Sequence, residues 1–143
     1  MSLVERSALV PYSARQMFEL VNDTASYPEF VPYCVKAIIH HETEFEQEAS
    51  LYFAKGAIRS SFTTRNRLVP VQQIEVHLVK GPFKRLTGTW DFKSLGKDAC
   101  RVNLSLEFEL SNPLLKATLG KLFDQISDRL VATFVQRAGK IYS

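Results

Sequence analysis

The sequence predicts an α+β fold in which a curved, seven-stranded antiparallel sheet wraps around one long C-terminal helix. Residues 112–141 carry apolar side chains at three- and four-residue steps, which is the period of an amphipathic helix. Residues 34–110 alternate between apolar and polar side chains in segments joined by short turns, and short turns make neighbouring strands antiparallel. A sheet with one apolar face needs a cover, and only the C-terminal helix is long enough to provide it.

The remaining elements follow in order along the chain. A first strand covers residues 3–10, and Ser13 with Gln16 forms a capping box that begins a helix. After this helix, residues 24–27 form a short second helix. The six later strands lie near residues 34–41, 46–55, 58–69 and 72–80, then around Leu86 to Phe92 and Val102 to Leu110.

The C-terminal helix begins at Asn112, whose side chain can cap the first turn, followed by Pro113 where a missing N–H costs nothing. Gly120 and Ser127 lie beside the apolar stripe, one heptad apart on the same flank. Small side chains there either let the helix pack closely on a strand or leave room for the wall of a cavity. The stripe consists of Leu115, Leu119, Leu122, Ile126, Leu130, Phe134 and Ile141.

Length and composition indicate one domain covering residues 1–143, because 143 residues with 45% hydrophobic side chains can bury one core but not two. The N-terminus lacks the apolar run of a signal peptide, and no stretch reaches 18 uncharged apolar residues. We therefore expect a soluble, cytoplasmic monomer. Cys34 and Cys100 lack the spacing of metal ligands and are expected to be free thiols.

Positive charge is concentrated in the middle of the chain. Residues 51–101 contain ten Lys and Arg against three Asp and Glu, a balance of +7, whereas residues 1–50 have a balance of −5 (three against eight). This asymmetry favours an anionic partner, either nucleic acid or a membrane surface. An ordinary solvated face with interspersed carboxylates is the competing interpretation. The candidate contacts on the outward face are Arg59, Arg65, Arg67, Lys84 and Arg85.

The segment from Tyr27 to Tyr33 contains two prolines and three aromatic residues, so it cannot be regular structure, yet it is too apolar for a solvated loop. It either packs as a rigid part of the core or acts as a stiff lid over a ligand. Further aromatic side chains point to the inner face of the sheet, where they form core or line a slot for a flat or chain-like apolar molecule. Our candidate ligand-binding residues are Tyr27, Phe30, Tyr33, Phe62, Phe83, Trp90, Phe92, Gly120, Phe123 and Ser127.

The sequence offers no constellation typical of catalysis. It has no glycine-rich phosphate loop, no Ser or Cys nucleophile with a recognisable base, and no pair of carboxylates in an apolar setting. His40 and His41 are adjacent on a strand, so we expect their side chains to leave opposite faces and not to share a metal. We expect neither a metal site nor enzymatic turnover.

An ordered set of short motifs over about 130 residues resembles the coenzyme Q-binding branch of the START-like, polyketide cyclase and lipid-transport superfamily. The small bacterial members called ribosome association toxins are the most similar. The motifs are Pro11-Tyr12-Ser13-Ala14, Phe18-Glu19-Leu20-Val21, Tyr27-Pro28-Glu29-Phe30-Val31-Pro32, Gly81-Pro82-Phe83, Trp90-Asp91-Phe92 and Leu110-Ser111-Asn112-Pro113.

The resemblance implies the helix-grip fold and an apolar cavity, with residues 27–33 and Phe83 at its rim. It implies, first, non-catalytic binding of a quinone-like or lipid-like ligand such as ubiquinone in support of respiration, with no cofactor required. It implies, as an alternative, a toxin of a toxin–antitoxin pair that binds the large ribosomal subunit and blocks subunit joining. A polyketide cyclase-like enzyme is a second alternative.

Overall fold

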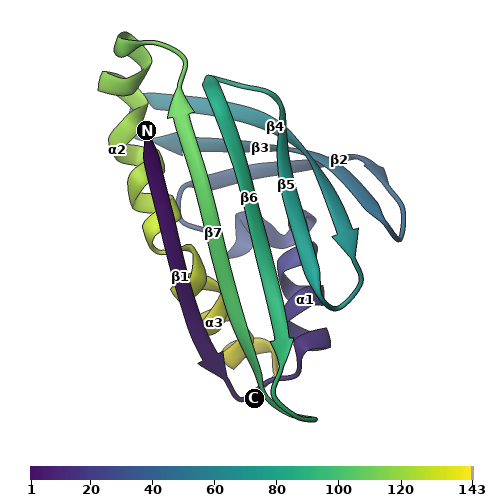
Figure 1. Ribbon diagram of the computed structural model, residues 1–143. Helices are drawn as coiled ribbons and strands as arrows, with labels where there is room; N and C mark the ends of the chain where they lie inside the picture. Colours follow the sequence, from purple (N-terminus) through teal and green to yellow (C-terminus); the bar gives the residue numbers. More distant parts are fainter. Residues whose placement is uncertain (143) are drawn as a thin grey trace.

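The computed structural model describes residues 1–142 and confirms the predicted class, a seven-stranded antiparallel sheet covered by C-terminal helices. Short hairpins connect β2 to β7 in sequence, and β1 pairs with β7 at one edge, which gives the strand order β1-β7-β6-β5-β4-β3-β2. Figure 1 shows the sheet curving around α2 and α3. The elements are β1 Ser2–Val10, α1 Ala14–Asn22, the 3₁₀ helix η1 Thr24–Glu29, β2 Cys34–Glu42, β3 Glu46–Lys55, β4 Ile58–Val69, β5 Gln73–Lys80, β6 Phe83–Ser94, β7 Cys100–Leu110, α2 Pro113–Asp128 and α3 Leu130–Tyr142.

The capping box before α1 is present as predicted. The amide of Gln16 donates to Ser13 Oγ at 3.1 Å, and the amide of Ser13 donates to Gln16 Oε1 at 2.9 Å. The short helix after α1 is longer than predicted, because η1 continues through Tyr27 and Pro28 to Glu29. Only the second part of the predicted loop is therefore irregular.

The C-terminal helix was predicted as one element, and the structure divides it at Arg129. The amide of Arg129 donates to the carbonyl of Ile126 at 3.3 Å, a three-residue step that tightens the last turn of α2. The hydroxyl of Ser127 donates to the carbonyl of Phe123 at 2.7 Å, and such back-bonding bends helices. The bend lets α2 and α3 follow the concave side of the sheet (Figure 1).

The prediction that His40 and His41 leave opposite faces was wrong. A register shift between Ile39 and His41 marks a bulge, which adds a residue that alternation alone cannot reveal. Both rings consequently contact outward-facing residues of β3: His40 Nε2 lies 2.7 Å from Ser50 Oγ, and His41 Nε2 lies 3.9 Å from Glu46 Oε2.

The core fills the space between the concave face of the sheet and the helices. Strand β7 shows the pattern most clearly, since Val102, Leu104 and Phe108 are buried while the alternating residues are less so. Phe134 of α3, which is 1% exposed, packs edge-on against Trp90 with a centroid distance of 5.3 Å. The helices thus replace solvent over the inner face of the sheet.

Candidate functional site

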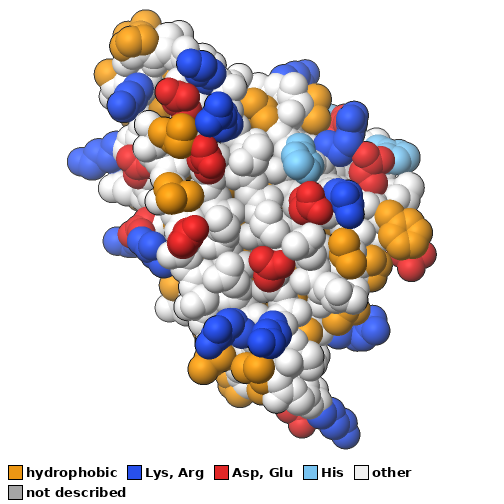
Figure 2. Space-filling model, in the orientation of Figure 1, with side chains coloured by type: hydrophobic (Ala, Val, Ile, Leu, Met, Phe, Trp, Pro, Cys, Tyr) orange, Lys and Arg blue, Asp and Glu red, His pale blue; other side chains and the backbone are white. Residues whose placement is uncertain are grey.

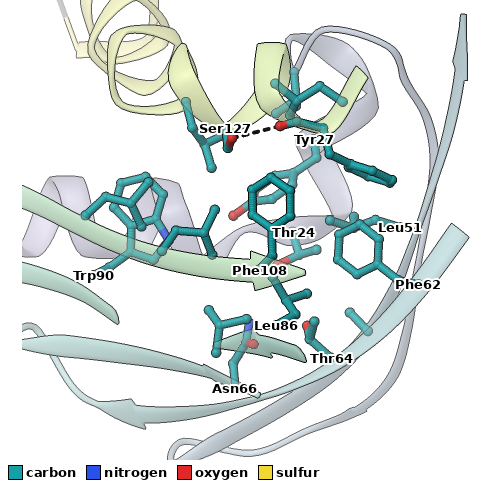
Figure 3. Close-up of a pocket in the computed structure, with 18 of the residues that line it drawn as sticks. Thr24, Tyr27, Leu51, Phe62, Thr64, Asn66, Leu86, Trp90, Phe108 and Ser127 are labelled. Atoms are coloured by element: carbon teal, nitrogen blue, oxygen red, sulfur yellow. Dashed lines mark hydrogen bonds between the residues drawn. The ribbon is translucent and has the colours of Figure 1, made fainter. Parts of the chain in front are cut away.

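An apolar cavity of about 130 Å³ lies between the concave face of the sheet and the junction of α2 with α3. Strands β3 to β7 form one wall, α2 and α3 form the other, and η1 closes one end (Figure 3). Most of the lining residues have purely hydrocarbon side chains. The six that carry polar atoms on their side chains are Thr24, Tyr27, Thr64, Asn66, Trp90 and Ser127.

Two groups of aromatic rings pack around the cavity. Beneath α2, Phe123 contacts Phe53, Phe62 and Phe83 with centroid distances of 5.8, 5.8 and 5.0 Å. The second group lies beneath α3, where Phe134 contacts Tyr27, Phe30 and Trp90, each with a centroid distance of 5.3 Å. Rigid rings that meet edge to face cannot close every gap between a bent helix and a curved sheet.

Three of the polar side chains in the wall already donate their hydroxyl protons to the protein. Thr24 donates to Gln47 Oε1 at 2.7 Å, Tyr27 donates to the carbonyl of Val21, and the hydroxyl of Ser127 is held by its own helix (Figure 3). Burial raises the pKa of Tyr27 well above that of an ordinary phenol, so this hydroxyl stays protonated and keeps its hydrogen bond.

Six of the ten predicted ligand-binding residues line the cavity, and four lie elsewhere. The six are Tyr27, Phe62, Phe83, Trp90, Phe123 and Ser127. Phe30 packs outside the cavity beneath the guanidinium of Arg137, whose Cζ lies 4.8 Å from the ring centroid. Phe92 lies behind Trp90, stacked on it with a centroid distance of 6.3 Å.

Tyr33 and Gly120 also lie outside the cavity. Tyr33 is 40% exposed, in a left-handed backbone conformation, with Lys55 Nζ 5.1 Å from its ring centroid. Gly120 faces an open groove of about 1010 Å³ between β1 and α2, next to Leu110. Seven residues turn a helix about 20° short of two full turns, and this drift separates Gly120 from Ser127 along the bent helix.

Sequence reasoning missed three polar residues of the wall, Thr24, Thr64 and Asn66. Thr24 belongs to η1, whose orientation no periodicity reveals. Asn66 was detectable, because alternation along β4 places it on the same inner face as Phe62, Thr64 and Leu68.

The predicted anion-binding residues lie on strands β4 and β6, and carboxylates neutralise three of them. Arg65 lies 3.3 Å from Glu46 and 2.8 Å from Glu48. Arg67 pairs with Glu75 at 3.8 Å, and Arg85 with Glu107 at 3.2 Å. Figure 2 shows basic, acidic and histidine side chains interspersed over the outer face of the sheet.

Arg59 and Lys84, by contrast, are exposed and form no ion pair with any residue in 1–142. Within the same residues no group of three or more His, Cys, Asp or Glu side chains is placed to hold a metal ion. No helix of this part of the chain has the length and apolar character needed to cross a membrane.

The fold and the cavity define a helix-grip protein with an apolar interior. The model of the polyketide cyclase / dehydrase and lipid transport family matches residues 10–135, and the chain belongs to this family. It is 49% identical over 139 residues to the ribosome association toxin RatA of Pseudomonas aeruginosa, a match that covers 97% of this chain and 96% of that protein. It is 27% identical over 135 residues to the mitochondrial coenzyme Q-binding protein COQ10 of Drosophila melanogaster, covering 92% of this chain and 56% of that protein.

Solved structures agree with this assignment. The 18 kDa protein CC1736 of Caulobacter crescentus superposes with a TM-score of 0.73 at 33% identity, covering 99% of both chains. The Zhui aromatase/cyclase of Streptomyces sp. R1128 superposes with a TM-score of 0.81 at 18% identity, covering 97% of this chain and 94% of that one. The cyclase therefore shares the fold, and at this identity the likeness carries no information about activity.

Proposed function

We propose that this protein associates with the ribosome and acts as a ribosome association toxin. The observation that carries the proposal is the 49% identity to RatA of P. aeruginosa, which extends over 97% of the chain rather than over a single motif. A globular protein without a free aromatic platform for single-stranded bases would bind ribosomal RNA mainly through phosphates. Two exposed cations are suited to that contact: Arg59 on the outer face of the sheet, and Lys84 at the groove between β1 and α2.

The ion pairs on this face decide how strongly such binding should depend on salt. If only Arg59 and Lys84 contact phosphates, the binding constant should fall about tenfold between 50 and 200 mM salt. If Arg65, Arg67 and Arg85 exchange their carboxylates for phosphates, five contacts would give a fall of about 10²- to 10³-fold. The measured dependence of the binding constant on salt therefore indicates how many arginines leave their carboxylates to contact phosphates.

Sucrose-gradient sedimentation of a cell extract with added protein tests the proposal. The protein should migrate with the large ribosomal subunit and reduce the fraction of joined ribosomes. A double variant, Arg59→Glu with Lys84→Glu, should lose this effect. The matched control, Lys93→Glu with Lys97→Glu, makes the same charge change toward the opposite end of β6 and should retain it. Absence of the unaltered protein from every ribosomal fraction at low salt would refute the proposal.

A second candidate function is non-catalytic binding of an apolar molecule, and the cavity itself is the observation that favours it. Its volume of about 130 Å³ is close to that of an engineered apolar cavity of about 150 Å³ that binds benzene. The cavity thus fits one six-membered ring, such as the head group of a ubiquinone-like quinone. An isoprenoid tail would have to extend past the rim, and residues 27–33 are the segment suited to move aside.

Organic extraction of the purified protein followed by mass spectrometry tests this second function. A quinone or another apolar molecule should be recovered, or should be taken up when it is added. Ser127→Leu fills the cavity from the helix side and should abolish uptake, whereas Gly120→Ala changes the same helix outside the cavity and should not. A protein that is empty and stays empty with added quinone would exclude this function and leave ribosome association untouched.

A further inference from the structure

Asn66 carries an unusual polar atom in the cavity wall. Its side chain extends from the inner face of β4 into the cavity (Figure 3), and its Oδ1 is buried without a hydrogen-bond partner among residues 1–142. Leaving a buried acceptor unpaired costs more than an average hydrogen bond contributes, so an orphan of this kind needs an explanation. One explanation is that a ligand donates a hydrogen bond to this oxygen when it is bound.

The neighbouring polar side chains do not supply the missing donor. Gln47 lies directly across from Asn66 on β3, but its Nε2 donates to the carbonyl of Asn22 at 3.0 Å and to Glu42 Oε2 at 2.6 Å. Both N–H groups of Gln47 are therefore used. The hydroxyl protons of Thr24, Tyr27 and Ser127 are committed within the protein as well, as described above. These four side chains have no proton left to donate to the cavity, and Thr64 and Trp90 line it without a hydrogen bond to Asn66 Oδ1.

We propose that Asn66 is the polar anchor of the cavity and that the cavity takes a single-ring ligand bearing a hydroxyl group, such as a phenol or a hydroquinone. This inference rests on the second candidate function. A ligand hydroxyl donates its proton to Asn66 Oδ1 and can also accept from the Asn66 amide nitrogen, so it satisfies the carboxamide in either orientation. The carbonyl of a quinone only accepts, and it leaves Oδ1 unpaired. The cavity accordingly prefers the reduced, hydroxylated form of such a ring.

The test uses phenol and benzene as probes, since both fit a cavity of this size. Isothermal titration calorimetry gives the two affinities for the unaltered protein and for Asn66→Leu, which keeps a similar volume without the carboxamide. Comparing the phenol-to-benzene ratio between proteins cancels the different cost of removing each probe from water. The ratio should fall about tenfold in the variant. Asn103→Leu makes the same change on β7, outside the cavity lining, and should leave the ratio unchanged.

The outcomes distinguish a failure of this inference from a failure of the second candidate function. A ratio that is equal in the unaltered protein and in Asn66→Leu would refute the role of Asn66 while leaving the cavity as an apolar site. Failure of both probes to bind the unaltered protein would overturn the second candidate function together with the inference. Should Asn66→Leu not fold, Asn66→Thr provides a shorter side chain, and nuclear magnetic resonance can follow the Asn66 side-chain amide directly. Phenol should shift that signal by more than benzene does, because benzene acts through its ring current alone; equal shifts would refute the hydrogen bond.

Discussion

The two faces of the sheet differ in what their side chains contact, and strand β4 shows the difference within twelve residues. On the inner face, Phe62 and Asn66 contribute to a cavity wall in which most groups are apolar. On the outer face, Arg65 and Arg67 form ion pairs with carboxylates of neighbouring strands. Since the side chains of a strand alternate between faces, one strand can serve both candidate functions, and substitutions on one face should leave the function of the other intact.

The largest expected effect on stability comes from removing a helix side chain that packs over the inner face of the sheet. Phe134 is 1% exposed and contacts three other rings, so Phe134→Ala removes a whole side chain from a packed site. We expect a loss of about 3–5 kcal/mol in the free energy of unfolding, measured by urea denaturation. Thr87→Ala on the exposed outer face of β6 is the control and should change stability by less than about 0.5 kcal/mol. Similar losses in the two variants would contradict the contrast between the faces.

The buried thiol of Cys34 provides a second test, because it should make the free energy of unfolding depend on pH. Burial raises the pKa of the Cys34 thiol to about 11, whereas a free thiol titrates near pH 8.5. The folded protein thus holds this proton after the unfolded chain has released it. The contribution is complete below about pH 8.5 and is lost as pH rises toward 11, by about 1–3 kcal/mol. Urea denaturation across this range should show a shallower decline for Cys34→Ala; identical declines would argue against the shift.

A smaller effect on the free energy of unfolding, of opposite sign, is expected at Gly120 of α2. A Cβ added at Gly120 would meet Leu110 Cδ1 and Lys116 Cγ at 3.8 Å, which is ordinary contact. Gly120→Ala should therefore stabilise the protein by about 0.5–1 kcal/mol, because alanine loses less backbone entropy in a helix. Thermal denaturation measures this gain. A loss of stability would mean that the helix packs more tightly at this position than the structure indicates.

The smallest effect is expected from the ion pairs of the outer face. Arg65 is exposed, and its pairs with Glu46 and Glu48 are open to solvent screening. Arg65→Gln should lower the free energy of unfolding by less than about 1 kcal/mol, and the difference should shrink in 1 M salt. A loss above about 2 kcal/mol that persists in high salt would show that this face contributes to stability as strongly as the core does.

The sequence by itself determined the order and type of nearly all elements, because these depend on local patterns. Ser13 with Gln16 and Asn112 with Pro113 identified two helix starts, and the alternation from Val102 to Leu110 identified a half-buried strand. Six of the predicted ligand residues also line the cavity, since inward-facing aromatic side chains of a curved sheet converge on one space.

Only the tertiary structure decided which small and polar residues face the cavity. The break at Arg129 and the bulge before His41 each change the direction of the following side chains, and neither leaves a trace in hydrophobic periodicity. Gly120 and Ser127 look equivalent along the sequence, but the bent helix sends one to a surface groove and the other to the cavity. The cationic partners of Glu46 and Glu75 depend on strand register, which long-range pairing sets. Alternation gives the face of Asn66, whereas its missing hydrogen bond is visible only once the side chains around it are placed in three dimensions.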